Sequence, residues 1–190
     1  MKKEEIFRIF KENNAILEGH FKLTSGRHSE QYLQCALVLQ DPAATSLLTT
    51  ELIKKLPPEK IDIVIGPALG GVTIAYEIAR QLGAKALFAE RENGAMTLRR
   101  GFKIPKGSRV LVAEDVITTG GSVLEVAEVV KQHGGSVVGI VSLVDRSNGK
   151  ADLGYPYYSL LTMEVVSYSE QECPLCAAGV PVIKPGSRPS

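Results

Sequence analysis

The feature that most constrains the fold is the alternation of apolar runs with amphipathic helical patterns between residues 61 and 144. Strands are expected in the β-branched runs, at 61–66, 84–90, 109–113 and 136–144. These runs are apolar throughout, and helical segments separate them, which is typical of a parallel sheet covered on both faces. The sequence therefore predicts an α/β fold with a central, mostly parallel sheet flanked by helices.

Glycine, proline and capping residues indicate where the helices begin and end. Apolar residues within 75–82 follow the spacing i, i+3, i+4, i+7, and Gly83 is expected to end that helix. Another helix is expected to begin near Ser122 and to stop at Gly134, and an earlier one begins with Pro42 after the N-cap Asp41. Right-handed crossovers then bring the strand carboxyl ends to one edge of the sheet, where ligands bind in such folds.

Composition excludes several classes of protein. The chain has 190 residues, a length typical of one domain, and its 22 basic against 21 acidic residues give a net charge of +1. Nucleic-acid binders usually show a clear basic excess, so we expect no nucleic-acid partner. No apolar run approaches the ~20 residues that span a membrane, and the first residues do not resemble a signal peptide. Three cysteines are too few for a disulfide scaffold, so we expect a cytoplasmic protein.

An α/β core is expected at about 41–146, and three regions of the chain do not follow its alternation of strands and helices. Residues 15–40 are expected to form short strands around a Ser-Gly turn, as a small N-terminal segment. Residues 91–108 are polar, basic and rich in glycine, and are longer than an ordinary connection, so they are expected to form a functional loop. The proline-rich tail, at about 172–190, is expected to be irregular.

The segment Val110–Val123, VLVAEDVITTGGSV, carries the clearest chemistry. It combines a buried strand, the adjacent acids Glu114 and Asp115, and a Thr-Thr-Gly-Gly turn at the start of a helix. Such a turn binds phosphate through backbone N–H groups, and without a Walker lysine it suits a terminal monophosphate. The acids can accept hydrogen bonds from vicinal hydroxyls or steady a magnesium ion. Together these features favour a ribose 5-phosphate ligand; the alternative is a plain turn and helix cap.

This segment resembles the phosphoribosyl-diphosphate (PRPP) signature of the type I phosphoribosyltransferases. The rest of the chain resembles the orotate phosphoribosyltransferases, in particular their compact bacterial and archaeal branch. The likeness lies in FKLTSGRHSEQY (Phe21–Tyr32), GPALGG (Gly66–Gly71, a diphosphate loop), FAERENG (Phe88–Gly94, leading into a mobile loop) and LVDR (Leu143–Arg146, at the base site). It implies the type I phosphoribosyltransferase fold, a single domain over 1–190 whose N-terminal region forms a small hood.

The resemblance also implies an activity. Members transfer the ribose 5-phosphate group of PRPP to orotate, giving orotidine 5′-monophosphate and diphosphate in pyrimidine biosynthesis. It further implies magnesium, held mainly by PRPP rather than by protein ligands, and a homodimer with shared active sites. Two alternatives stay open: a purine phosphoribosyltransferase, and a PRPP-binding regulatory module without catalysis.

Site residues follow from the resemblance by position. Glu114 and Asp115 are expected at the ribose hydroxyls and residues 118–122 at the 5-phosphate, while Thr118 and Arg146 contact orotate, whose carboxylate suits a guanidinium. The whole PRPP-binding set is Glu114, Asp115, Val116, Ile117, Thr118, Thr119, Gly120, Gly121 and Ser122. The expected catalytic residues are Arg91, which in the family reaches the diphosphate across a dimer interface, Arg99, Arg100 and Asp115.

The chain departs from the better-known branch at three lysine positions. Thr24, Gly70 and Glu92 stand where that branch has lysine, in the first Ser-Gly segment, the diphosphate loop and the mobile loop respectively. The loop lysine and histidine that serve catalysis there have no clean counterpart. Arg99, Arg100 and Lys103 offer replacement positive charge.

Cys173 and Cys176 form a lone C-x-x-C pair, which is half of a zinc site. His133 and Cys35 are possible companions; a redox pair, or a reduced turn that packs the tail, are the alternatives. His20 and His28 flank the Ser-Gly turn. For His28 two interpretations stay open, a lining of the base pocket and a solvated loop position.

Overall fold

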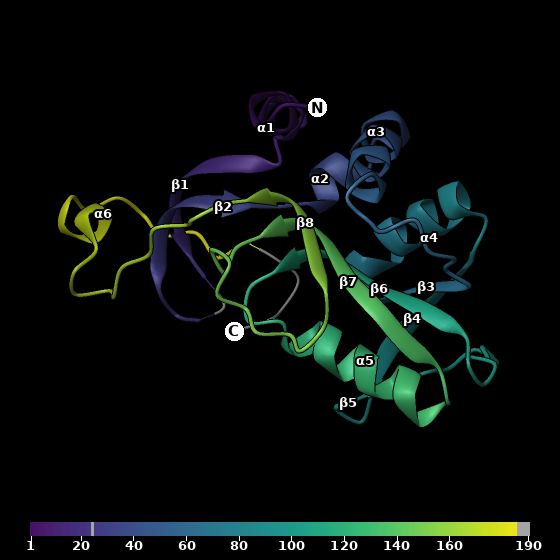
Figure 1. Ribbon diagram of the computed structural model, residues 1–190. Helices are drawn as coiled ribbons and strands as arrows, with labels where there is room; N and C mark the ends of the chain where they lie inside the picture. Colours follow the sequence, from purple (N-terminus) through teal and green to yellow (C-terminus); the bar gives the residue numbers. More distant parts are fainter. Residues whose placement is uncertain (24, 186–190) are drawn as a thin grey trace.

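The computed structural model describes residues 1–23 and 25–185, so Thr24 and the last part of the expected tail, 186–190, lie outside the described residues. A six-stranded sheet in the order β5-β4-β3-β6-β7-β8 forms the centre (Figure 1). Its five parallel strands are β3 (Ile63–Pro67), β4 (Lys85–Glu92), β6 (Arg109–Ile117), β7 (Ser136–Asp145) and β8 (Tyr157–Thr162). β5 (Ala95–Thr97) pairs antiparallel with β4 at one edge. The expected α/β class with a mostly parallel sheet is confirmed.

Helices cover both faces of this sheet (Figure 1). α3 (Pro42–Ile53) and α4 (Gly70–Leu82) pack on one face, in the same apolar cluster as Leu111 and Ala113 of β6. α5 (Gly121–Gln132) packs on the other face, with Val110 and Val112. Because successive side chains of a strand point to opposite faces, a strand buried on both sides must be apolar throughout. This is why the strands appear in the sequence as continuous apolar runs.

Two of the predicted helix boundaries, at Asp41 and Gly83, are confirmed by their caps, and α5 begins at Gly121 and ends at Gln132, within two residues of the prediction. The Asp41 carboxylate accepts a hydrogen bond from the backbone N–H of Ala43 at 2.9 Å, at the start of α3. Gly83 ends α4 in the left-handed conformation with φ 66°. None of the helices in the described ranges is long and apolar enough to cross a membrane.

A separate hairpin lies beside the sheet (Figure 1). It consists of β1 (Ile16–Lys22) and β2 (His28–Leu33), which pair antiparallel; α1 (Lys3–Glu12) precedes it and the short α2 (Ala36–Leu39) follows. The C-terminal segment returns to it, with α6 (Pro174–Ala177) and isolated bridges from Ile183 to Phe21 and from Tyr168 to His28. The hairpin falls in the range expected for the hood, and the tail is bound to it.

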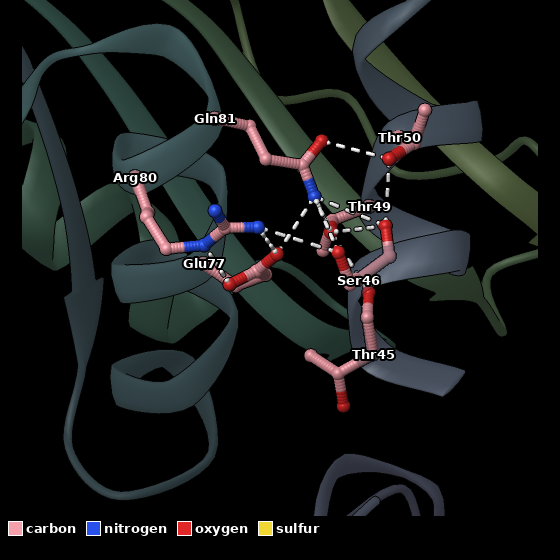
Figure 2. A network of polar contacts seen from close by, with 7 residues as sticks. All are labelled: Thr45, Ser46, Thr49, Thr50, Glu77, Arg80 and Gln81. Atoms are coloured by element: carbon pink, nitrogen blue, oxygen red, sulfur yellow. Dashed lines mark hydrogen bonds and ion pairs between the residues drawn. The ribbon is translucent and has the colours of Figure 1, made fainter. Parts of the chain in front are cut away.

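A polar network joins α3 to α4 within the otherwise apolar helical layer (Figure 2). The Gln81 side-chain amide donates to the Thr49 hydroxyl at 2.8 Å and accepts from the Thr50 hydroxyl at 2.9 Å. Arg80 pairs with Glu77 through two hydrogen bonds of 2.8 and 2.7 Å, and this bonding lowers the pKa of Glu77 to about 2. The network fixes the packing of α4, whose first residues belong to the candidate site.

The structure differs from the sequence prediction in two places. The sheet continues past the expected core boundary at residue 146, because β8 adds a fifth parallel strand after β7. The loop expected at 91–108 begins instead as a hairpin, in which β4 turns into β5 through Asn93 and Gly94, with φ 52° and 85°. An Asn-Gly pair with both residues at positive φ matches the twist of two antiparallel strands, which explains the hairpin.

Candidate active site

A cavity of about 890 Å³ opens at the carboxyl ends of β3 and β6. From β3 the chain passes through α4 to β4 on one side, and from β6 it passes through α5 to β7 on the other. The strand order therefore reverses between β3 and β6, and in open α/β sheets ligands bind at such a switch point. Of the expected PRPP-binding residues, all except Val116 line this cavity.

The floor of the cavity is the turn from β6 into α5. Gly120, the N-cap residue of α5, has φ 82°, and a Cβ there would lie 2.2 Å from Leu153 Cδ2. Both the backbone conformation and the close approach of Leu153 therefore require glycine. The first N–H groups of a helix lack intrahelical partners, and with the helix dipole they attract an anion. The turn has the properties of a phosphate site, and Thr118, Thr119 and Ser122 add hydroxyl groups to it.

Two adjacent acids, Glu114 (buried) and Asp115 (partly buried), stand directly before this turn. Glu114 is 9% exposed, and its carboxylate accepts a hydrogen bond from the Asp115 N–H at 3.2 Å. Asp115 accepts one from the Val116 N–H at 2.9 Å. Burial, and next the charge of Asp115, raise the pKa of Glu114 to about 9, and burial also raises the pKa of Asp115. Burial thus disfavours the charged forms of both carboxyls, and a nearby cation or hydroxyl donors would stabilise those charged forms.

The loop after β3 approaches these acids closely. A Cβ on Gly70 would lie 2.6 Å from Asp115 Oδ1, and a Cβ on Gly66 would lie 2.3 Å from the Gly71 carbonyl oxygen. The loop contains a cis peptide bond between Ala68 and Leu69. Gly70 stands where the better-known branch has lysine, and in this chain any side chain there would collide with the Asp115 carboxylate. The glycines let the loop backbone, rather than a side chain, form this wall of the cavity.

Positive charge reaches the cavity from three separate parts of the chain. Lys22, at the end of β1, and Lys184, near the end of the described tail, both line it, as does Arg91 of β4. Arg91 donates to the Gly94 carbonyl oxygen at 2.8 Å and to Glu125 at 2.9 Å. Neither lysine was predicted from the sequence. Lys22 stands two residues before Thr24, the position where the better-known branch has a lysine, and this could have indicated a role for Lys22. No motif near Lys184 indicated a role for it.

Arg99 and Arg100 do not line the cavity in the described structure. Arg100 forms two hydrogen bonds of 2.8 and 3.0 Å with the Glu90 carboxylate. Arg99 Nε lies 3.2 Å from Glu92. Both arginines are thus held by acids of β4, and a direct catalytic role would require these ion pairs to open.

The two residues expected to contact orotate, Thr118 and Arg146, differ in their position relative to the cavity. Thr118 lines the cavity. Arg146 follows β7, and its backbone N–H donates to the Ile117 carbonyl oxygen at 2.8 Å. Burial lowers the pKa of Arg146, opposed by the charges of Tyr32 and Cys35, and Nε of Arg146 is buried with no hydrogen-bond partner among the described residues. Tyr32, whose charge acts on Arg146, lines the cavity, whereas Arg146 is not among the described lining residues.

His28 and the expected companions of the cysteine pair lie elsewhere than predicted. His28 is 2% exposed and is not among the described lining residues of the cavity, so neither interpretation of it was right. Cys35 is buried, and burial followed by the charge of Asp115 raises its pKa. The His133 Nδ1 lies 2.8 Å from the Val129 carbonyl oxygen at the end of α5. The side chains that face Cys173 and Cys176 are those of His20 and His28 instead.

Comparison with known proteins places this geometry in a family. Residues 43–174 match the phosphoribosyl transferase domain. The orotate phosphoribosyltransferase of Pelotomaculum thermopropionicum is 59% identical over 188 residues, covering 99% of both chains. That of Caldicellulosiruptor bescii is 56% identical with the same coverage. The crystal structure of orotate phosphoribosyltransferase from Aeropyrum pernix superimposes with a TM-score of 0.68 at 29% identity, covering 82% of this chain and 92% of that one.

The sequence identities and the extent of the matched chain agree with the geometry of the cavity. The glycine-rich turn at the start of α5, the acids Glu114 and Asp115 and the glycine loop meet at the switch point of the sheet, and all three lie within the matched residues 43–174. The chain belongs to the phosphoribosyl transferase family and, within it, to the orotate phosphoribosyltransferases.

Proposed function

We propose that this protein is an orotate phosphoribosyltransferase that transfers the ribose 5-phosphate group of PRPP to orotate, giving orotidine 5′-monophosphate and diphosphate. The observation that carries the proposal is that a glycine-rich turn at a helix N-terminus and the acids Glu114 and Asp115 line one cavity. Arg146 follows the neighbouring strand, and its Nε is buried with no hydrogen-bond partner among the described residues. The relatives named for this activity match the whole chain, including the hairpin and the tail that border the cavity.

The 5-phosphate, the ribose and the diphosphate of PRPP are assigned to different parts of the cavity. Thr118, Thr119 and Ser122, with the backbone N–H groups of residues 118–122, bind the 5-phosphate. Glu114 and Asp115 accept hydrogen bonds from the ribose hydroxyls, which suits carboxyl groups that lie beside the turn. The glycine loop at 66–71 contacts the diphosphate through its backbone.

Orotate is assigned to the side of the cavity that Tyr32 and Thr118 line, next to which we place the Arg146 side chain. Its planar carboxylate matches the fork of a guanidinium, and the unpartnered Nε of Arg146 offers a buried donor for it. A purine base has no carboxylate, so this arginine disfavours the purine alternative.

The donor set of the cavity fits magnesium. Mg²⁺ prefers oxygen ligands, and a cation would stabilise the charged forms of Glu114 and Asp115, whose pKa values burial raises. When bound with PRPP, the ion would neutralise charge that develops on the diphosphate. Most of its ligands are expected to come from PRPP, with Asp115 and Glu114 nearest to it.

The residues of the chain orient the reactants and stabilise the departing charge. Anionic orotate needs no protein nucleophile, so the protein holds its ring nitrogen against the ribose carbon as that carbon becomes positively charged. Lys22, Lys184 and Arg91 supply the cations nearest to the diphosphate. Arg99 and Arg100 join them only if the segment after β5 moves and releases Glu90 and Glu92.

The assembly and the compartment are also proposals. We propose a homodimer with shared active sites, because the exposed apolar residue Leu69 stands in the diphosphate loop itself. Arg91 contacts this chain's own Glu125, so its contact across the dimer remains a prediction. We propose that the enzyme works in the cytoplasm, which is consistent with the free thiols of its cysteines.

The proposal is tested by the near-ultraviolet absorbance of orotate after addition of the protein, PRPP and magnesium. We expect a loss of absorbance that requires magnesium and is matched by an equal amount of diphosphate. Adenine, hypoxanthine and uracil in place of orotate form a control panel that should give little diphosphate.

Three outcomes distinguish the alternatives. Consumption of a purine base instead of orotate would assign the enzyme to purine chemistry. Tight calorimetric binding of PRPP without turnover of any base would support the regulatory module. Absence of both binding and turnover would contradict the assignment of the cavity.

A further inference from the structure

Four metal-ligating side chains converge outside the cavity, where the C-terminal segment meets the hairpin. His20 and His28 come from β1 and β2, while Cys173 is the N-cap residue of α6 and Cys176 lies within that helix. One ligand atom of each side chain lies within 4.8 Å of all the others. None of these residues belongs to the described lining of the catalytic cavity.

The distances match a tetrahedral site. His20 Nε2 lies 2.9 Å from His28 Nδ1 and 3.4 Å from Cys173 Sγ, and Cys176 Sγ lies 3.2 Å from His28 Nδ1 and 3.7 Å from His20 Nε2. A zinc ion with bonds of ~2.0–2.3 Å separates neighbouring nitrogen and sulfur ligands by roughly 3.3–3.8 Å. Small side-chain adjustments would therefore place all four atoms around one ion.

The position of the proton on His20 leaves one ring nitrogen free to bind a metal ion. His20 Nδ1 lies 2.7 Å from the carbonyl oxygen of Val180. A carbonyl oxygen only accepts, so Nδ1 carries the proton and Nε2 presents its lone pair to the cluster. A histidine that ligates zinc usually donates its other N–H to a backbone carbonyl or a carboxylate in this way. Three polar groups converge on this single lone pair, an arrangement that a shared cation explains.

The local backbone is arranged to aim these side chains inward. The register of β1 and β2 shifts between Glu18 and Phe21, so a bulge contains His20. Neighbouring residues of a regular strand face opposite sides, yet His20 and Phe21 are both buried, at 2% and 6% exposure. His28 and Cys173 are also 2% exposed. Three of the four side chains are therefore buried and Cys176 is partly exposed, and such limited access to water favours a closed, structural site.

We propose that His20, His28, Cys173 and Cys176 bind one zinc ion, which fastens the C-terminal segment to the N-terminal hairpin. Nitrogen and thiolate ligands in a Cys₂His₂ set select zinc over magnesium or calcium. The ion joins residues 153 positions apart in the chain, His20 and Cys173. The segment that it fastens leads to Lys184, which lines the catalytic cavity.

The first test is the metal content of the full-length protein, purified without chelator and dialysed against metal-free buffer. We expect one zinc per chain, and loss of at least nine-tenths of it in Cys176→Ser. Cys35→Ser is the matched control, because Cys35 is a buried cysteine outside the cluster, and it should retain the full content. Cobalt in place of zinc should give two spectral features. These are the intense visible d–d bands of a tetrahedral ion and the near-ultraviolet band of thiolate-to-cobalt charge transfer.

A second measurement remains informative if the cysteine variant folds poorly. In the wild-type protein, titration of thiols with a mercurial should release one zinc per chain, and cleavage by a glutamate-specific protease at the exposed Glu170 and Glu172 should then accelerate at least tenfold. Wild-type protein that lacks zinc and gives no tetrahedral cobalt spectrum would overturn the proposal. So would a Cys173–Cys176 disulfide in the freshly purified protein, which would assign the pair to redox chemistry.

Discussion

At the scale of single residues, the site depends on glycine as much as on charged side chains. Gly70 packs its Cα against the Asp115 carboxylate, and Gly120 fits under Leu153. Both positions bring backbone close to where the phosphates of PRPP are proposed to bind. A lysine at position 70 would provide charge but would displace Asp115. Here, Lys22 and Lys184 bring positive charge from outside the loop instead.

Arg146 carries the proposed choice of base, so its substitution should affect orotate selectively. We expect Arg146→Lys to raise the KM for orotate about 10- to 100-fold, because the change keeps the charge but loses the bidentate geometry, a loss of ~1.5–3 kcal/mol. The calorimetric affinity for PRPP should stay within twofold of wild type. Initial rates at saturating PRPP measure the first effect.

Arg8→Lys is the matched control, since Arg8 is an exposed guanidinium on α1, paired only with Glu12 among the described residues. It should leave both constants unchanged. If Arg146→Lys instead lowers the melting temperature without a change in the KM for orotate, Arg146 supports the fold and another residue selects the base.

At the scale of elements, the contact between α3 and α4 contains a pH-dependent ion pair. Hydrogen bonds from Arg80 lower the pKa of Glu77 to about 2 from its ordinary value of 4.5. Stabilisation from this carboxylate is therefore complete above pH 4.5 and is lost as the pH falls through 2. Arg80 is 56% exposed, so screening reduces the contribution to about 1 kcal/mol. We expect Glu77→Gln to lower the free energy of unfolding by that amount at pH 7.

Urea unfolding at pH 7, 4 and 3 measures this difference, which should shrink between wild type and variant as the pH falls. Glu12→Gln, which removes one partner of the exposed Arg8–Glu12 pair, should show no measurable change at any pH. A difference between Glu77→Gln and wild type that stays constant with pH would mean that the variant disturbs helix packing rather than a charge.

The elements that the sequence predicted are those whose signals are local. β3, β6, β7, α4 and α5 each have an apolar pattern and glycine punctuation within the segment itself. β8 was missed because its place beside β7 depends on pairing between distant segments, and α6 is too short to show a helical period. In the site, Glu114–Ser122 could be predicted because those residues are contiguous. Lys184 and the pairing of His20 with Cys173 could not, because only the folded tail brings them there.

At the scale of the whole molecule, an apolar stripe adjoins the catalytic cavity. Leu69 is 83% exposed and Tyr76 is 63% exposed, and their seven-residue spacing places them on the same side of α4 and its N-cap. Exposed apolar residues in such a stripe mark an interaction surface. Because Leu69 lies between Ala68 and Gly70, which line the cavity, a partner bound here would border the active site. This stripe is therefore our candidate for the proposed dimer interface.

We expect the wild-type protein to have twice the chain mass of 20.5 kDa in light scattering coupled to size exclusion, and Tyr76→Glu to have the mass of one chain. A buried carboxylate without a partner would disfavour the interface by several kcal/mol. Because the active sites are proposed to be shared, the turnover of the monomeric variant should fall at least tenfold, and a higher protein concentration should restore part of it. Val166→Glu, which changes an exposed apolar residue of the segment that follows β8, should remain dimeric and active. A wild-type monomer with full turnover would show that one chain forms the complete site. Arg91 would then contribute to the active site of its own chain and not to that of a partner.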